Sequence, residues 1–273
     1  MIPAAFDYVR ASSAEEAASL LAEHGEGAKL LAGGHSLLPL MRLRLATPSV
    51  LIDLGEIAEL SYVRVDGDSV AIGALTRHCD VAASEELRRD VPLLAHVASQ
   101  LGDPQVRHRG TIGGSIAHGD PASDLPAALL ALRGSIVVTG PRGTRQIEAD
   151  AVFADFLETS IAADEVMTEV RVPKMSGASW SFQKFNRRAQ DWAIVGCAVV
   201  RNGATGVALV NMGPVPLRAS AVERALGEGA SDVEAALLAD EGLEPPADLN
   251  ASSAFRRHLS HVFVGRALAE ARR

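Results

Sequence analysis

The sequence has very few cysteines. Only two occur among 273 residues, Cys79 and Cys197, and their sequence contexts are unrelated. Two cysteines cannot by themselves hold an iron–sulfur cluster or a structural zinc ion, so neither centre is expected on this chain. Both are interpreted as buried thiols of a cytoplasmic protein, because disulfides persist mainly in oxidising compartments.

Long apolar runs and clustered basic residues are also missing. No apolar run approaches the roughly 18 residues that a membrane span needs. The formal net charge is −8 and no basic run is longer than a pair such as Arg187-Arg188. This argues against nucleic acid as a partner, because phosphate binding needs a concentrated basic face. The first residues contain no basic segment followed by an apolar stretch, so no signal peptide is expected.

What is present is a globular composition with mixed local patterns. Hydrophobic residues make up 48% of the chain and charged residues 22%, which is typical of a folded protein with a buried core. Candidate strands and helices follow one another without a regular βαβ order, so the predicted class is α+β. Ser13 to Glu16 predicts a capping box that opens a helix ending at Gly25. Further helices are expected at 80–87, 92–101 and 125–132.

The last third of the chain predicts a three-stranded antiparallel sheet followed by helices. The Asn202-Gly203 pair is a strong hairpin signal. The three strands are expected at Trp180–Phe185, Ala193–Val200 and Val207–Met212, and the helices at Ala219–Leu226, Asp232–Leu238 and Ser252–Ala271. Lys174 to Ser179 is small and polar, and it predicts a domain boundary. The expected domains are 1–175, with subdomains at about 1–55 and 56–175, and 178–273.

A first glycine pair follows the predicted strand Lys29–Ala32, within Ala32-Gly33-Gly34-His35-Ser36. Adjacent glycines let a ligand approach the main chain closely. Successive N–H groups can then form an anion-binding concavity, to which the Ser36 hydroxyl adds a donor. The pattern suits a pyrophosphate, although it is neither a Walker loop nor G-x-G-x-x-G. A Gly-Gly pair alone is more often a plain turn.

A second loop of the same character is expected at Thr111-Ile112-Gly113-Gly114-Ser115. Two such cradles in one chain favour a long diphosphate ligand that is contacted at both ends. Asp124 follows at short range. Its carboxylate could accept hydrogen bonds from sugar or ribityl hydroxyls, or it could cap the helix that begins at Leu125, and both roles can coexist.

These segments resemble a known family. Lys29 to Pro39, KLLAGGHSLLP, resembles the first FAD motif of the medium subunit of the xanthine dehydrogenase family, and Thr111 to His118, TIGGSIAH, resembles its second motif. The likeness extends over 105–110 and 120–124, and 184–193 is similar to the segment that opens the family's carboxy-terminal domain. The resemblance implies a PCMH-type FAD-binding domain followed by a small α+β domain of the carbon monoxide dehydrogenase flavoprotein type.

The resemblance also implies which residues hold FAD. In the family, the first motif grips the pyrophosphate through backbone amides, with the preceding residues beside the adenosine end, and the second motif holds the cofactor from the other side. The corresponding residues here are Lys29, Leu30, Leu31, Ala32, Gly33, Gly34, His35, Ser36 and Leu37 in the first motif, and Thr111, Gly114, Ser115 and His118 in the second. Asp124 matches an acidic residue that contacts the cofactor.

Four further positions match cofactor contacts but leave alternatives open. Leu101 and Met167 match hydrophobic positions near the ring system, and ordinary core positions are an equal alternative. Trp192 matches a position near the flavin ring, where an indole could stack on the isoalloxazine; the alternative is a half-buried aromatic at a strand start. Lys184 matches a basic position near the flavin's polar edge, although Gln183 could align there equally well.

No catalytic residue and no metal ligand is expected on this chain. His35 and His118 each lie inside a phosphate-binding motif, so contact with the cofactor is the favoured interpretation over proton transfer.

The implied function is electron transfer within a larger complex. Because the chain lacks cluster cysteines and any likeness to a molybdenum-cofactor domain, the molybdopterin cofactor and the [2Fe–2S] clusters are expected on a large and a small partner subunit, in a dimer of heterotrimers. Electrons would pass from the clusters through FAD to an external acceptor. Any membrane contact would be made through the complex. Carbon monoxide is the first expectation for the substrate, which the molybdenum subunit would select.

Two other functions are carried as alternatives. The first is a self-sufficient flavoprotein oxidoreductase of the same FAD-binding superfamily, which the short carboxy-terminal portion disfavours. The second is a non-catalytic assembly protein in which the glycine pairs are plain turns.

Overall fold

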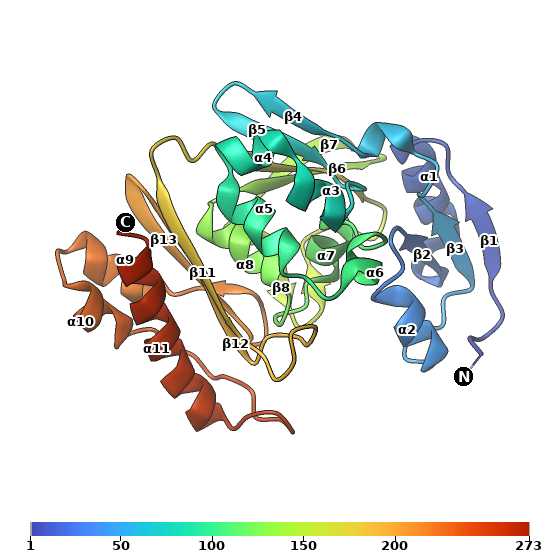
Figure 1. Ribbon diagram of the computed structural model, residues 1–273. Coiled ribbons are helices and arrows are strands. Elements are labelled where there is room, and N and C mark those ends of the chain that lie inside the picture. The colour runs from blue at the N-terminus through green and yellow to red at the C-terminus, as the bar shows by residue number, and fades with distance from the viewer. Residues whose placement is uncertain (1, 273) are drawn as a thin grey trace.

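The computed structural model describes residues 2–272, so the outermost residues of the two expected domains, Met1 and Arg273, lie outside the described part. Its helices and strands are organised around three larger sheets and one small hairpin (Figure 1). The predicted α+β class is confirmed. None of the helices between residues 2 and 272 combines the length and apolar character that a membrane crossing requires.

The amino-terminal sheet is parallel and has three strands. β3 (Val50–Asp53) lies between β1 (Asp7–Arg10) and β2 (Ala28–Leu31). Helix α1 (Ala14–His24) packs its buried alanine and leucine side chains against this sheet. Helix α2 (Leu37–Arg42) follows β2 after a short loop.

The predicted ends of α1 are confirmed. The Ser13 hydroxyl accepts a hydrogen bond from the Glu16 amide, and Gly25 ends the helix with φ +56°. The predicted capping box is only half formed, because the Glu16 carboxylate accepts hydrogen bonds from the amide and the hydroxyl of Ser12 instead of the Ser13 amide.

The central sheet is antiparallel and has five strands. Their order is β4 (Val63–Asp66), β5 (Ser69–Gly73), β10 (Val166–Pro173), β6 (Ser135–Gly140) and β7 (Gly143–Glu148). Six helices lie between β5 and β6 in the sequence: α3 (His78–Ala83), α4 (Glu85–Asp90), α5 (Pro92–Ser99), α6 (Pro104–Arg107), α7 (Ile112–His118) and α8 (Asp124–Ala131). β8 (Phe153–Asp155) and β9 (Glu158–Thr159) form the small hairpin.

The prediction of one continuous helix at 80–87 was wrong. The chain breaks at Ser84, which separates α3 from α4. The Ser84 hydroxyl accepts a hydrogen bond from the Leu87 amide and therefore caps a new helix.

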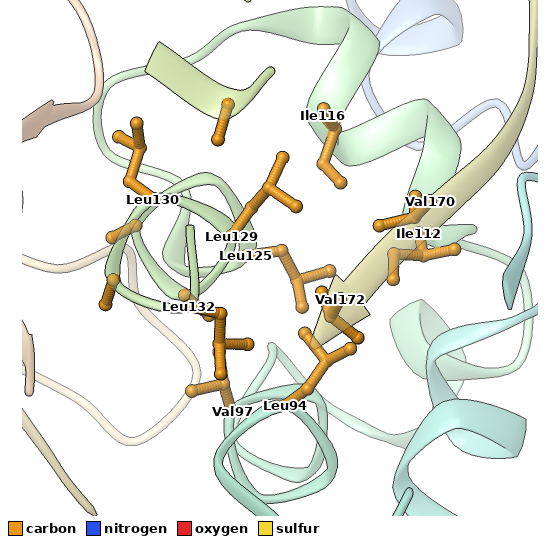
Figure 2. Packing of buried hydrophobic residues seen from close by; sticks show 14 of the residues in the cluster. Leu94, Val97, Ile112, Ile116, Leu125, Leu129, Leu130, Leu132, Val170 and Val172 are labelled. Carbon is orange, nitrogen blue, oxygen red and sulfur yellow. The ribbon is translucent and has the colours of Figure 1, made fainter. Parts of the chain in front are cut away.

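Helix α8 lies at the centre of the largest buried cluster. All of its residues are buried, as expected for a helix whose residues after Asp124 are all apolar. Figure 2 shows its leucines among side chains of α5, α7 and β10: Leu94, Val97, Ile112, Ile116, Val170 and Val172. The same cluster continues into Val200 of β12 and Val210 of β13.

The carboxyl-terminal sheet confirms the three predicted antiparallel strands and adds a fourth of two residues. The strands are β11 (Ser179–Phe185), β12 (Val195–Asn202), β13 (Ala204–Val210) and β14 (Leu217–Arg218). Alternate residues of β12 and β13 belong to two different cores. One face meets α8, and the other is covered by α9 (Ser220–Gly227), α10 (Asp232–Ala236) and α11 (Ser253–Glu270) (Figure 1).

Candidate functional site

A large cleft lies where the parts of the chain that carry the three larger sheets meet. Its volume is about 1020 Å³, and its walls come from the loop between β2 and α2, from α7, and from the segment that contains Lys184 and Trp192. Every residue predicted to hold the cofactor lines this cleft except Leu31. The Leu31 side chain lies beneath Gly34, close enough that a Cβ on that glycine would approach it to 3.3 Å.

The first glycine motif is an open loop whose amide groups are free. Among residues 2–272, no hydrogen-bond acceptor is found for the backbone N–H groups of Gly33, Gly34, His35 and Ser36. Gly34 has φ +76°, a conformation that residues with a side chain rarely adopt. Four consecutive unpaired N–H groups at the wall of a cleft form a donor set suited to a phosphate or pyrophosphate.

Gly33 brings the two glycine motifs into contact. A Cβ atom on Gly33 would overlap the carbonyl oxygen of Arg109 and lie 2.8 Å from the Cα of Gly110. The backbone of the first loop therefore passes directly against the backbone that leads into the second motif. Only glycine fits at this crossing, because both neighbours are main-chain atoms.

The second motif is the first turn of a helix, which corrects the prediction of a loop. Thr111 is the N-cap of α7, and its hydroxyl accepts a hydrogen bond from the Gly114 amide at 3.2 Å. The Ile112 amide donates to Thr76 O at 3.0 Å, and the Gly113 amide donates to Ala74 O at 2.9 Å. Because these amides are already used inside the protein, they leave few donors for a ligand.

Asp124 and Lys184 form a buried ion pair at the wall of the cleft. Lys184 Nζ donates to Asp124 Oδ2 at 2.7 Å, and the two side chains are 13% and 2% exposed, respectively. The other carboxylate oxygen, Oδ1, is buried and has no partner within residues 2–272. Burial raises the pKa of the Asp124 carboxyl, and the Lys184 ammonium opposes that shift.

Asp124 is not the N-cap of helix α8, although this role was one of its two predicted roles. Ser123 occupies the cap position without a side-chain hydrogen bond, and Asp124 is the first helical residue. Its side chain faces Lys184 and the cleft instead of the helix amides. Lys184 lies on β11 with its ammonium group held by Asp124, so the ion pair joins the carboxyl-terminal sheet to α8.

Trp192 lies in the loop between β11 and β12, not at a strand start as the alternative prediction had it. β12 begins at Val195, and the indole is 59% exposed at the mouth of the cleft. Leu101 and Met167 line the cleft as well, and both also belong to the central hydrophobic core or pack against it. The two interpretations of these residues are thus compatible.

Three histidines line the cleft, one of which was not predicted from the sequence. His35 Nδ1 lies 3.2 Å from Gly33 O within the first motif, and His118 ends α7. The missed residue is His78, which is only 3% exposed. Burial lowers the pKa of His78 to about 4, and electrostatic interactions with His35 and Arg107 add to the effect. Nothing in its local sequence marks it, because only the fold places it beside the second motif.

The residues present fit FAD better than they fit a metal. Among residues 2–272, no cluster of three or more potential metal ligands occurs. The cleft instead offers a row of free amides for a diphosphate and an unpartnered carboxylate oxygen for a hydroxyl. Apolar side chains such as Leu101 and Met167 suit an aromatic ring.

Comparison with known proteins agrees with this fit. The family described as FAD binding domain in molybdopterin dehydrogenase matches residues 4–175, and the CO dehydrogenase flavoprotein C-terminal domain matches residues 180–271. The chain is similar to the carbon monoxide dehydrogenase medium chain of Hydrogenophaga pseudoflava, with 42% identity over 279 residues that cover 98% of this chain and 97% of that protein.

Two further similarities extend the comparison. A solved carbon monoxide dehydrogenase from Hydrogenophaga pseudoflava, which lacks the Mo-pyranopterin moiety, has a chain that superimposes with a TM-score of 0.95 at 43% identity, covering 99% of this chain and 98% of that one. The 6-hydroxypseudooxynicotine dehydrogenase complex subunit alpha of Paenarthrobacter nicotinovorans is 35% identical, over 99% of this chain and 96% of that protein. The chain therefore belongs to the family of FAD binding domains in molybdopterin dehydrogenases, and it carries that family's CO dehydrogenase flavoprotein C-terminal domain.

Proposed function

We propose that this chain is the FAD-carrying subunit of a molybdenum hydroxylase of the carbon monoxide dehydrogenase type. The observation that carries the proposal is the row of unpaired amides from Gly33 to Ser36 at the wall of the cleft. A pyrophosphate supplies the acceptors that these groups lack. The family to which the chain belongs and its similarity to the medium chain of Hydrogenophaga pseudoflava support the same conclusion.

The chain's residues have distinct tasks in this proposal. The first loop binds the pyrophosphate, with Lys29 and Leu30 beside the adenosine end. Asp124 Oδ1 accepts a hydrogen bond from a sugar or ribityl hydroxyl, since it is a buried acceptor without a partner. Trp192 shields the flavin from solvent at the cleft mouth, and Lys184 holds Asp124 in place.

The complete reaction needs partner subunits. Bound FAD accepts two electrons and releases them singly or as a hydride, which connects one-electron carriers with a two-electron acceptor. The chain has only two cysteines, too few for an iron–sulfur cluster. We assign the [2Fe–2S] clusters to a small subunit and the molybdopterin cofactor to a large one, in a dimer of heterotrimers.

The substrate is selected outside this chain. Relatives of comparable length are named for carbon monoxide and for 6-hydroxypseudooxynicotine. Chains that share this fold thus serve different substrates, which fits selection at the molybdenum subunit. Carbon monoxide is our assignment because the more similar of these two relatives is the carbon monoxide dehydrogenase chain.

We also propose a cytoplasmic location and two domains, 1–175 and 178–273. Both cysteines are free thiols, and Cys197 is fully buried, which suits a reducing compartment. The matches of two separate families to residues 4–175 and 180–271 support the division.

The test is to purify the chain alone and together with its partner subunits, and to identify any released chromophore. We expect about one FAD per chain, and no substrate oxidation by the chain alone. Substrate oxidation by the isolated, flavin-loaded chain would instead indicate a self-sufficient flavoprotein. Folded protein that incorporates no flavin even in the assembled complex would overturn the proposal and favour an assembly role.

A further inference from the structure

His78 is fixed against the second glycine motif. Its ring is buried, and its backbone amide donates to Gly110 O at 3.0 Å. A Cβ atom on Gly110 would lie only 2.6 Å from His78 Nε2. The absence of a side chain at Gly110 therefore makes room for the imidazole edge and holds it close to α7.

The imidazole has one hydrogen-bond partner among residues 2–272. His78 Nε2 lies 3.2 Å from Ser115 Oγ. The other ring nitrogen, Nδ1, is buried and has no partner in the described chain. Ser115 lines the cleft and makes no other side-chain hydrogen bond with residues 2–272. If the proton between the two groups belongs to His78 Nε2, the Ser115 hydroxyl is free to donate to a ligand. If it belongs to Ser115, the hydroxyl donates to His78 instead.

Two neutral arrangements of this pair are possible. With the proton on Nδ1, Ser115 donates to Nε2, and a buried N–H is left without an acceptor. With the proton on Nε2, the ring donates to Ser115 Oγ, and the atom left alone is an acceptor, Nδ1. Among buried main-chain groups, unpaired N–H donors are rarer than under-satisfied acceptors, and we extend that preference to this ring. The buried position of the ring also disfavours its protonated form, so the two neutral arrangements are the ones to compare.

We propose that His78 is a positioning residue: its Nε2–H donates to Ser115 Oγ, which turns the Ser115 hydroxyl proton toward a phosphate oxygen of the cofactor. This inference rests on the proposed function. It gives the second motif a donor to the ligand even though its first amides are used inside the protein. The donor is a side chain oriented by a neutral imidazole, whereas the first motif uses its main chain.

The first test is the tautomer of His78 in the full-length protein, measured by 15N chemical shifts of the imidazole. We expect the Nε2–H form in the presence of FAD. A wild-type spectrum that shows the Nδ1–H form would overturn the proposal, whatever the variants do.

The second test compares the affinity for FAD and for riboflavin, which lacks phosphate, using the full chain or the assembled complex. His78→Phe and Ser115→Ala should each weaken FAD binding roughly tenfold, the loss expected for one hydrogen bond to a charged group. The double variant should bind no more weakly than either single variant, because both changes remove the same donor. Riboflavin binding should be unchanged.

Two matched variants separate orientation from folding. His78→Gln keeps an N–H donor near the position of Nε2 and should bind FAD within roughly threefold of wild type. His96→Phe alters a histidine that packs against Trp180 away from the cleft, and it should have no effect. Unchanged FAD affinity in His78→Phe, or additive losses in the double variant, would contradict the inference. A wild-type protein that binds no FAD would instead remove the proposed function itself.

Discussion

Ala32–Ser36 and Thr111–Ser115 both contain a Gly-Gly pair with a serine one or two residues after it, but their backbones make different hydrogen bonds. In the first segment the amides of Gly33 to Ser36 have no acceptor among residues 2–272. In the second, the amides from Ile112 to Ser115 are all satisfied by Thr76, Ala74 and Thr111. This difference supports our proposal that the first segment binds a ligand through its main chain, whereas the second supports a helix.

The difference follows from what each segment packs against. The first loop leaves a strand edge and borders the cleft, so its donors meet no protein acceptor. The second begins beside the turn Ala74–Thr76, whose carbonyl groups take up its donors. A glycine in a motif of this kind can therefore be needed for close backbone packing, and its presence does not show that the backbone binds a ligand.

The largest effect is expected from Gly33→Ala. The new methyl group would overlap the Arg109 carbonyl, so the two motifs would have to separate. We expect a loss of about 3 kcal/mol or more in the free energy of unfolding, together with loss of bound FAD. Denaturant unfolding and flavin content measure the two effects. Gly227→Ala is the control, since a Cβ there meets nothing within 4 Å, and it should leave both unchanged.

Gly113→Ala should be milder and should affect stability alone. A Cβ there would lie 2.7 Å from Ala74 O, which forces α7 away from the turn that receives its amides. We expect a loss of about 1–3 kcal/mol in unfolding free energy. The FAD affinity of the folded fraction should stay within roughly threefold, because the first loop is untouched. A loss of FAD affinity in Gly113→Ala without any loss of stability would contradict the conclusion that the backbone of the second motif supports a helix and does not bind the ligand.

Acid should weaken the protein through His78. Its folded pKa, about 4, lies below its ordinary value of 6.5, so the unfolded chain binds the proton more readily. Unfolding free energy should therefore fall as the pH drops from 6.5 toward 4, by about 2 kcal/mol between pH 8 and pH 5 from this group. Thermal unfolding of wild type and His78→Gln across this range tests the sign. Equal pH dependence in the two proteins would count against a buried neutral His78.

The smallest effects are expected from removing the hydroxyl groups of Thr111 and Ser36, which border the two glycine pairs. Thr111→Ala removes the cap of α7 and should cost about 1 kcal/mol of unfolding free energy, while Thr111→Ser should restore it. Ser36 makes no capping hydrogen bond to α2. Ser36→Ala should therefore leave stability within about 0.5 kcal/mol and weaken only FAD binding. Unfolding titrations measure the loss of stability in Thr111→Ala, and flavin fluorescence titrations measure the loss of FAD affinity in Ser36→Ala. A loss of stability in Ser36→Ala as large as that in Thr111→Ala would contradict this prediction.

Much of the fold could be predicted from local patterns. Ser13 and Gly25 specify the ends of α1, and Asn202-Gly203 specifies the turn between β12 and β13. These signals act over a few residues, so the sequence contains them directly. β4 and β7 were not predicted, because both are mostly exposed strands with charged residues that show little hydrophobic contrast.

The candidate site could be predicted only in part. The residues of both motifs were found from resemblance, but the helical start at Thr111 depends on carbonyl groups of a distant turn. The pairing of Lys184 with Asp124 and the position of His78 depend on contacts between residues far apart in the chain. Such contacts are created by the packing of whole elements, and no local pattern encodes them.

Helix α8 has a consequence for how the chain can be divided. The two family matches separate at about residue 178, in a short exposed link. The main hydrophobic core contains residues from both sides of that link. Helix α8 belongs to the first match, whereas Val200 and Val210, which lie in the same core, belong to the second. A fragment cut at the link would expose to water the apolar side chains of α8 that now meet the carboxyl-terminal sheet. We therefore expect the two parts to stabilise each other although two separate families match them, so any exchange of the carboxyl-terminal part between relatives must preserve the surface that meets α8.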